Sequence, residues 1–432
     1  MRKPRSTLLT TAGAAFAAVL GLLLSLAGPF VGRAEAAAAG IHVSDGRVVE
    51  GDGSAFVMRG VNHAYTWYPE QTGSIADIAA KGANTVRVVL GSGGRWTKTS
   101  ASEVSTLIGQ CKANKVICVL EVHDTTGYGE DGAATSLDQA ADYWISVKSA
   151  LEGQEDYVVV NIGNEPFGNT NYTAWTDATK AAIAKLRGAG IGHALMVDAP
   201  NWGQDWSGTM RNNAASVFAS DPDRNTIFSI HMYGVYDTAT EVRDYLNAFV
   251  GNGLPIVVGE FGDQHSDGNP DEDAIMATAQ SLGVGYIGWS WSGNGSGVEY
   301  LDMVNGFDPN SLTSWGDRFF NGSNGIVETS ETATVYGGGD DGSTGGTAPN
   351  GYPYCVNGSA SDPDGDGWGW ENDRSCVVPG GAADSGGDGS TGGTAPNGYP
   401  YCVNGSASDP DGDGWGWENS RSCVVRGSAA DR

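Results

Sequence analysis

The sequence contains few basic residues. Lysine and arginine together number 24, against 51 aspartate and glutamate residues, and the formal net charge is −27 at pH 7. Nucleic acids and anionic membranes repel so acidic a protein, so neither is expected as a partner. The charge also suits an extracellular protein that must stay soluble, and by itself it identifies no substrate.

Cysteine is scarce as well, with six in 432 residues. No CxxC pair and no Cys/His spacing indicates zinc, so no metal site is predicted from them. Four of the six fall into two pairs of equal spacing, Cys355 with Cys376 and Cys402 with Cys423. This pattern fits one disulfide in each of two small repeats in an oxidising compartment. For Cys111 and Cys118, a bridge and two buried free thiols both remain open.

A long apolar run, Ala12–Val31, lies close to the N-terminus. Basic residues at positions 2, 3 and 5 precede it, and Ala34-Glu35-Ala36 follows it with small residues suited to cleavage. Residues 1–38 are therefore predicted to be a secretory signal, and the mature protein to be extracellular without a membrane partner. The alternative is a membrane anchor, because the run approaches the roughly 20 residues that span a bilayer.

Glycine-rich nucleotide-binding motifs are missing after the predicted strands, which argues against a doubly wound sheet. Within residues 39–336, Val/Ile-rich runs instead alternate with Ala-rich helical stretches. The eight runs are Phe56–Asn62, Thr85–Leu90, Val116–His123, Tyr157–Glu165, Ala194–Pro200, Ile227–Tyr233, Pro255–Gly262 and Tyr286–Ser292. Eight such units in about 300 residues predict an α/β fold of the (β/α)8 TIM-barrel type.

Most of these runs end in polar or aromatic residues, where a barrel strand would reach its C-terminal face. The series is Asn62-His63, Arg87, His123-Asp124, Asn164-Glu165, Asn201-Trp202, His231 and Tyr233, Glu260, and Trp289. Strands buried on both faces are expected to be nearly continuous in aliphatic residues, and active sites of TIM barrels lie at this face. The series therefore predicts a catalytic site there.

Two carboxylates end the fourth and seventh runs, Glu165 in VVVNIGNEPFG and Glu260 in PIVVGEFG. In a barrel these strands face one another across the mouth. Paired carboxylates are the groups that hydrolyse glycosidic bonds, one as nucleophile and the other as proton donor.

The large domain resembles family 5 glycoside hydrolases, which are retaining TIM-barrel enzymes. Asn-Glu on strand four, Glu on strand seven, Arg on strand two and Trp on strand eight carry the match. Within that family, RGVNHAYTWYP, VLEVHDTTG and GWSWSGNG look like the bacterial endo-β-1,4-mannanases. The resemblance implies hydrolysis of internal bonds in mannan, galactomannan and glucomannan, without a required cofactor.

The same resemblance implies roles for individual residues. Glu165 becomes the acid/base and Glu260 the nucleophile, and Arg87 is expected to keep the pKa of Glu260 low. The implied substrate-binding residues are Trp67, Arg87, His123, Asn164, Trp202, His231, Tyr233 and Trp289. Trp291 is harder to place, because strand alternation points one tryptophan of Trp-Ser-Trp away from the substrate.

The segment Asp341–Val378 recurs at Asp388–Val425, with Asp373 replaced by Ser420. Both copies contain DPDGDGWGWEN, whose acidic half resembles a calcium-binding loop. That loop type needs a carboxylate at its twelfth position, which the second copy lacks. Weak calcium binding therefore remains open.

The repeats resemble family 10 carbohydrate-binding modules, in which GWGWEN and RSC carry the match. The resemblance implies a flat cellulose-binding face formed by Trp368, Trp370, Trp415 and Trp417. In the alternative interpretation, one tryptophan of each pair does not bind sugar and instead forms the hydrophobic core of a very small module.

The predicted organisation is a signal at 1–38, a catalytic barrel at 39–336, a linker at 337–350, a module at 351–378, a second linker at 379–397 and a second module at 398–425. The prediction is a monomeric, secreted endo-β-1,4-mannanase with β-mannan as substrate and cellulose as anchor. Two alternatives are an endo-β-1,4-glucanase and a non-catalytic, calcium-dependent polysaccharide-binding protein.

Overall fold

The computed structural model describes residues 40–295 and 297–337, and short segments between residues 352 and 431. The predicted signal at 1–38 and nearly all of both predicted linkers lie outside the described residues. Among the helices that the structure describes, none has the length and apolar character needed to span a bilayer.

Eight parallel strands close into a barrel in the order β10-β3-β4-β5-β6-β7-β8-β9. They are β3 (Arg59–His63), β4 (Thr85–Leu90), β5 (Ile117–Val122), β6 (Val158–Asn161), β7 (Leu195–Asp198), β8 (Thr226–Met232), β9 (Ile256–Phe261) and β10 (Gly285–Gly288). Each predicted run overlaps one of these strands, so the predicted TIM barrel is confirmed.

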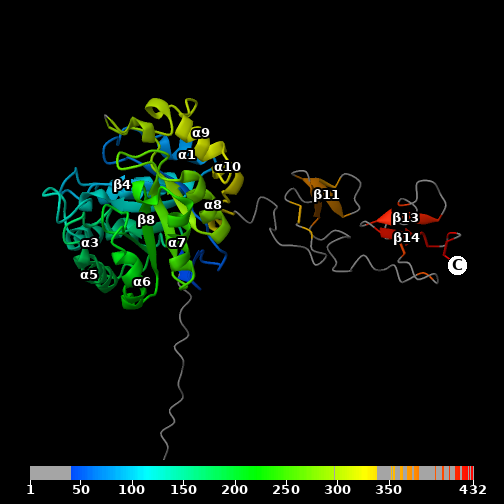
Figure 1. Ribbon diagram of the computed structural model, residues 1–432, viewed down its shortest axis with the longest axis horizontal. Coiled ribbons are helices and arrows are strands. Elements are labelled where there is room, and N and C mark those ends of the chain that lie inside the picture. The colour runs from blue at the N-terminus through cyan, green and yellow to red at the C-terminus, as the bar shows by residue number, and fades with distance from the viewer. Residues whose placement is uncertain are drawn as a thin grey trace, which may run out of the picture. The chain divides into compact units, whose positions relative to one another are not determined.

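Helices follow the strands along the chain and surround the barrel (Figure 1). They are α1 (Ser74–Ala80), α2 (Ala101–Ala113), α3 (Leu137–Ser146), α4 (Lys148–Leu151), α5 (Trp175–Gly188), α6 (Thr209–Ser220), α7 (Ala239–Val250), α8 (Glu272–Leu282), α9 (Ser314–Asn321) and α10 (Ile326–Thr329). Short 3-10 turns are η1 (His123–Thr125), η2 (Tyr172–Ala174), η3 (Gly234–Tyr236), η4 (Glu299–Leu301), η5 (Asn305–Phe307) and η6 (Thr334–Tyr336). Local sequence fixes some helix starts: Ser100 with Glu103 and Ser136 with Gln139 form capping boxes at α2 and α3.

Strand alternation divides the barrel into an outer and an inner core. On β5, Cys118 and Leu120 pack outward with the helices, whereas Ile117 and Val119 pack inside the barrel. The inner apolar residues lie mostly towards the N-terminal ends of the strands. Beyond them, the same inward-facing positions become polar, as at Glu121 on β5.

The N-terminal pole of the barrel is closed by a hairpin and by the end of the domain. The hairpin strands are β1 (His42–Ser44) and β2 (Arg47–Val49), and η6 packs with them against the inner core. Glu50 accepts hydrogen bonds from the backbone N–H groups of Thr334 and Val335, at 2.9 and 3.1 Å. These contacts bring the two ends of residues 40–337 together.

The third cysteine pair is not bridged in the structure. Cys111 on α2 and Cys118 on β5 are both buried free thiols. Burial in this apolar layer raises the pKa of Cys118 well above its usual value, so the thiol stays protonated at neutral pH.

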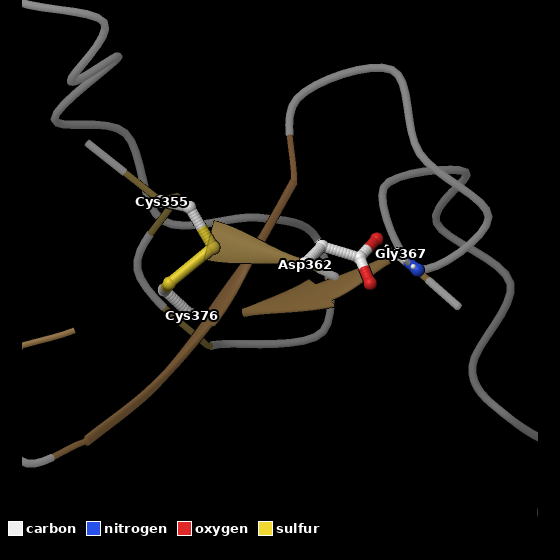
Figure 2. The surroundings of a disulfide bond; sticks show 4 residues. All are labelled: Cys355, Asp362, Gly367 and Cys376. Atoms are coloured by element: carbon white, nitrogen blue, oxygen red, sulfur yellow. Dashed lines mark hydrogen bonds between the residues drawn. A yellow bond between two sulfur atoms is a disulfide. The ribbon is translucent and has the colours of Figure 1, made fainter. Parts of the chain in front are cut away.

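Each C-terminal repeat forms a two-stranded hairpin with a disulfide, as predicted. The first pairs β11 (Trp368–Glu371) with β12 (Arg374–Val377), and the second pairs β13 (Trp415–Glu418) with β14 (Arg421–Val424). The disulfides join Cys355 to Cys376 and Cys402 to Cys423 (Figure 2). A Cβ added at Gly369 would lie 2.5 Å from Sγ of Cys355, so the glycine lies directly against the disulfide.

The tryptophans flanking this glycine bear on the binding prediction. Trp368 is half-buried and meets Tyr352 edge-on at 4.9 Å between ring centroids, and Trp415 is 37% exposed. Because strand residues alternate, Trp368 lies on the face opposite the disulfide that Gly369 contacts. The side chains of Trp370 and Trp417 lie outside the described residues.

The Asp-rich loop of the first repeat is described only at its ends. Oδ2 of Asp362 accepts a hydrogen bond from the backbone N–H of Gly367 at 2.8 Å, and so closes its own turn (Figure 2). The loop residues between them lie outside the described residues. Calcium binding stays a prediction.

Candidate active site

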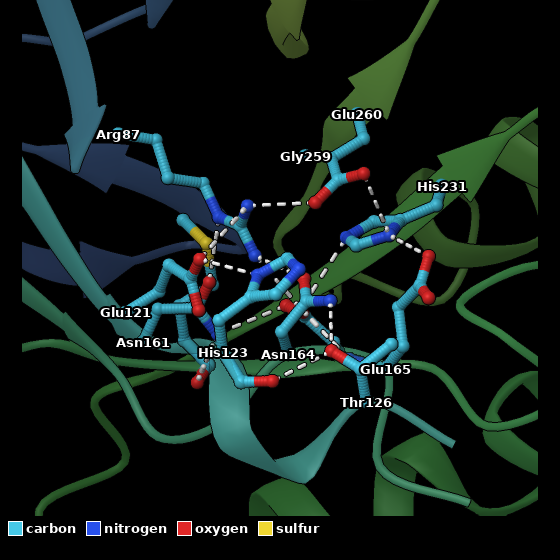
Figure 3. Close-up of polar contacts among 12 residues, drawn as sticks. Arg87, Glu121, His123, Thr126, Asn161, Asn164, Glu165, His231, Gly259 and Glu260 are labelled. Carbon is cyan, nitrogen blue, oxygen red and sulfur yellow. Dashed lines mark hydrogen bonds and ion pairs between the residues drawn. The ribbon is translucent and has the colours of Figure 1, made fainter. Parts of the chain in front are cut away.

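Polar side chains gather at the C-terminal ends of the barrel strands, as the sequence indicated. Figure 3 shows Arg87, Glu121, His123, Asn164, Glu165, His231 and Glu260 converging from different strands. They reach the same space because inward-facing positions at the top of each parallel strand point to the barrel axis. Their hydrogen bonds form one network around a buried cation.

That cation is Arg87 on β4, whose side chain is fully buried. Nη1 donates to Oε1 of Glu260 and to Oδ1 of Asn62, both at 2.8 Å. Nη2 donates to Oδ1 of Asn164 at 2.7 Å and to Oδ2 of Asp198 at 3.1 Å. Burial opposes the charge, but Glu121, Asp198 and Glu260 outweigh it and raise the pKa of Arg87. The guanidinium is therefore a permanent charge at the base of the site.

Two hydrogen-bond donors hold Glu260 on β9, and an imidazole nitrogen lies near it. Besides Arg87, the hydroxyl of Tyr233 donates to Oε2 at 3.0 Å, and Nδ1 of His231 lies 3.5 Å from the same oxygen. Burial raises the pKa of Glu260, His231 and Arg87 lower it, and the charge of Glu165 raises it again; the pKa is raised overall. The expected low pKa was wrong, because burial outweighs the flanking cations.

Glu165 follows β6 and faces Glu260 through His231 (Figure 3). Oε1 of Glu165 lies 2.8 Å from Nδ1 of His231, whose other nitrogen lies 3.3 Å from Oδ2 of Asp198. Burial lowers the pKa of His231, but Glu260, Asp198 and Glu165 raise it to about 10. At neutral pH this imidazole is therefore a cation lying between the two carboxylates.

The spacing of the two carboxylates bears on their chemistry. A carboxylate oxygen of each and a ring nitrogen of His231 all lie within 4.8 Å of one another. A metal ion at this trio would have to compete with the proton for the imidazole nitrogen. A close pair of carboxylates with one strongly held by donors suits attack by one and proton donation by the other.

Aromatic rings line the side of the site formed after β10, β3 and β4. Trp289 stacks on His123 with 5.8 Å between centroids, and Trp67 meets His123 edge-on at 5.0 Å. Trp96 packs edge-on against Trp67 at 5.3 Å. Trp291 is fully buried and packs against the helices, so Trp289 is the tryptophan of Trp-Ser-Trp that faces the site.

Trp202 lies on the opposite side, after β7. A Cβ at Gly127 would lie 2.4 Å from its ring, which leaves no room there for a larger residue. The structure thus places every predicted catalytic and substrate-binding residue of the barrel around one site.

Four further residues of this site were missed by the sequence prediction: Trp96, Glu121, Asn161 and Asp198. Glu121 contacts Nδ1 of His123 at 2.8 Å, and Asp198 accepts from Asn161 Nδ2 at 2.9 Å. Three of these residues lie within strands: Asn161, Glu121 and Asp198. Glu121 is two residues before the predicted site residue His123, so strand alternation would have indicated it. Trp96 lies in a loop and carries no such signal.

Comparisons with known proteins agree with this geometry. A model of the family described as cellulase (glycosyl hydrolase family 5) matches residues 49–295. A model described as a cellulose or protein binding domain matches residues 344–378 and 391–425.

Individual relatives extend over most of the chain. A mannan endo-1,4-beta-mannosidase from Streptomyces lividans is 88% identical over 385 residues, covering 89% of this chain and 100% of that protein. One from Cellvibrio japonicus is 54% identical over 365 residues, covering 83% and 82%. The crystal structure of a beta-mannanase from Streptomyces thermolilacinus with mannohexaose has a TM-score of 0.68 and 60% identity, covering 69% of this chain and 99% of that one.

Proposed function

Since the chain belongs to glycosyl hydrolase family 5, we propose that it is a retaining endo-β-1,4-mannanase that cleaves internal bonds of mannan, galactomannan and glucomannan. The observation that carries the proposal is the pair Glu165 and Glu260, with oxygens within 4.8 Å of each other and with Arg87 and Tyr233 bound to only one of them. The named activity of the 88% identical relative supports mannan as the substrate.

The asymmetry of the two carboxylates assigns their roles. Arg87 and Tyr233 orient Glu260 and favour its ionised form, so its free oxygen lone pair attacks the anomeric carbon. Glu165, which has no guanidinium partner, gives its proton to the glycosidic oxygen as that bond breaks. A glycosyl ester on Glu260 results, and Glu165 then takes a proton from the water that hydrolyses it. Retention fits the short distance, because inverting enzymes hold their carboxylates about 6.5–9.5 Å apart.

The surrounding residues bind the sugar on which this chemistry occurs. Asn164, held by Arg87, presents its amide beside Glu165 and is proposed to bind the 2-hydroxyl of the sugar being cleaved. The indole of Trp289 forms the floor below that sugar, and the imidazole of His123 stacks on this indole. Trp67 and Trp202 provide apolar faces for neighbouring sugars.

The decisive assay compares galactomannan, glucomannan and carboxymethylcellulose. We expect the protein to release reducing sugar from both mannans far faster than from carboxymethylcellulose. The reverse order would identify an endo-β-1,4-glucanase, and no release from any of the three would leave a non-catalytic polysaccharide-binding protein.

The C-terminal modules are proposed to anchor the enzyme to cellulose in plant cell walls. The family match at 344–378 and 391–425 supports binding to cellulose, and the aromatic rings of Trp368 and Trp415 offer faces for sugars. The enzyme is further proposed to act outside the cell as a monomer, in line with the predicted signal at 1–38. Catalysis requires no cofactor in this scheme, and calcium, if it binds the Asp-rich loops, binds weakly.

A further inference from the structure

Trp206 is a large aromatic side chain that the catalytic scheme does not use. It lies in the loop between β7 and α6, and 54% of its surface is exposed. Single exposed apolar residues are common on protein surfaces and need no explanation by themselves. Trp206 differs from such residues because its ring is fixed and because it adjoins the candidate active site.

Two contacts from the loop after β6 fix the indole. Nε1 of Trp206 donates to Oδ1 of Asn169 at 2.7 Å, and Tyr172 meets the ring edge-on at 5.5 Å between centroids. Neighbouring Asp205 is buried and accepts hydrogen bonds from the backbone N–H groups of Met210 and Arg211, at 2.8 and 2.9 Å. The ring therefore keeps its orientation without a ligand, which lowers the entropic cost of binding one.

The same two loops hold Trp202, so Trp206 lies near it. A Cβ at Gly168 would lie 3.0 Å from Nε1 of Trp202, and the next residue, Asn169, binds Nε1 of Trp206. The backbone N–H of Trp202 also donates to the carbonyl of Phe167 at 3.3 Å. Residues 167–169 thus contact both indoles, which places the two rings beside each other along one edge of the barrel mouth.

Barrel order shows which part of a polysaccharide reaches this edge. Trp289, Trp67 and Trp96 follow β10, β3 and β4, whereas Trp202 and Trp206 follow β7, on the opposite side of the closed sheet. Glu165 follows β6, next to β7, and in the proposed mechanism it protonates the leaving oxygen. The sugars that leave with that oxygen therefore extend over the β6 and β7 loops.

We propose that Trp206 and Tyr172 form an outer sugar-binding platform on the leaving-group side, which holds a backbone sugar of β-1,4-mannan beyond the one near Trp202. This inference rests on the proposed mannanase function. The platform binds through the exposed face of the indole, while its N–H is already satisfied by Asn169. Such an outer site selects long chains over short ones and sets where a chain is cut.

The test compares two substrates in the full-length chain. Mannohexaose is long enough to reach the platform, whereas an aryl β-mannobioside places only its small aryl group on the leaving-group side. Trp206→Ala should lower the ratio of kcat/KM for mannohexaose to that for the aryl mannobioside about tenfold, equivalent to about 1.4 kcal/mol. Its mannohexaose products should shift towards cuts that leave fewer sugars on the leaving-group side.

Matched variants separate this role from a structural one. Trp206→Phe keeps an aromatic face and should recover most of the ratio, whereas Asn169→Ala releases the indole and should give an intermediate loss. Val250→Ala changes an exposed apolar residue at the end of α7 and should leave the ratio unchanged. An unchanged ratio and product pattern in Trp206→Ala, or an equal loss on both substrates, would overturn the platform. If the unmodified protein does not hydrolyse mannohexaose at all, the proposed function fails instead.

Discussion

Glu165 and Glu260 are the same residue type in the same site, and they differ in their neighbours. Glu260 accepts from Arg87 and Tyr233, whereas Glu165 contacts His231. In the proposed mechanism, the donors from Arg87 and Tyr233 favour the ionised form that a nucleophile needs, and this difference in partners divides the two roles.

Removing either carboxylate should therefore give a distinct kinetic defect. Glu260→Ala should abolish turnover because no ester can form, and added azide should restore activity by attacking the sugar in its place. Glu165→Ala should spare the first step for substrates whose leaving groups need no protonation. Rates on aryl mannosides and on mannan, with and without azide, measure both effects. Near-normal turnover of Glu260→Ala would contradict the assignment.

Arg87 is expected to control the acid limit of activity. The pKa of Glu260 is already raised by burial, and Arg87 opposes that rise. Arg87→Ala should raise this pKa further, so Glu260 would take up its proton at a higher pH and the acid limb of kcat/KM would move to higher pH. Loss of a buried ion-pair partner should also cost roughly 3–5 kcal/mol of stability.

A pH profile of kcat/KM beside a thermal melt tests both parts. Lys185→Ala is the matched control, because it removes a cation from a surface pair with Asp138. This control should leave the profile in place and cost at most about 1 kcal/mol. An acid limb that stays fixed in a folded Arg87→Ala protein would show that another group sets it.

At the scale of elements, two-residue alternation does most of the positioning. On β5, Ile117 and Val119 fill the barrel, while Glu121 on the same face enters the catalytic network. In the modules, alternation puts Gly369 against the disulfide and Trp368 on the other face. In both architectures, alternation along a strand decides which face each side chain takes.

The hairpins of the modules should not tolerate a side chain at the central glycine. Added Cβ atoms at Gly369 and Gly416 would lie 2.5 and 2.6 Å from Sγ of Cys355 and Cys402. The double variant Gly369→Ala, Gly416→Ala should lose retention on insoluble cellulose while hydrolysing soluble mannan normally. Gly109→Ala is the control, because its Cβ would meet no atom within 4 Å. Full retention by the double variant would show that the hairpins adapt.

At the scale of the whole molecule, the proposed catalytic and anchoring functions lie in separate parts of the chain. The last described turn of the barrel domain, η6, packs on the barrel: the hydroxyl of Tyr336 donates to the carbonyl of Val116 at 2.8 Å. The Streptomyces thermolilacinus structure matches 69% of this chain and 99% of its own. A chain that ends near Tyr336 should therefore hydrolyse soluble mannan at a nearly unchanged rate and bind insoluble cellulose much less.

Pull-down on cellulose also distinguishes aromatic binding from calcium binding. Replacing Trp368 and Trp370 by Ala should leave weak binding, and replacing Trp415 and Trp417 as well should leave almost none, because two modules on one chain share a high effective concentration. A chelator should have little effect on the unmodified protein. Release by the chelator together with retention of the four-tryptophan variant would assign binding to the Asp-rich loops.

The sequence by itself determined the barrel, the repeats, their disulfides and most of the residues at the barrel mouth. These features depend on periodicity and position along the chain: each strand repeats every two residues, and its last residues meet those of its neighbours. Glu165, Glu260 and Arg87 could therefore be predicted to meet without any coordinates.

Only the tertiary structure decided what surrounds those groups. The raised pKa of Glu260 depends on burial and on charges from other strands. Asp198 on β7 joins the network because it contacts Arg87 on β4 and His231 on β8. The orientation of Trp206 likewise depends on Asn169, a residue in another loop. Sequence order carries no such distances, because they arise only when the closed barrel brings remote strand ends and loops together.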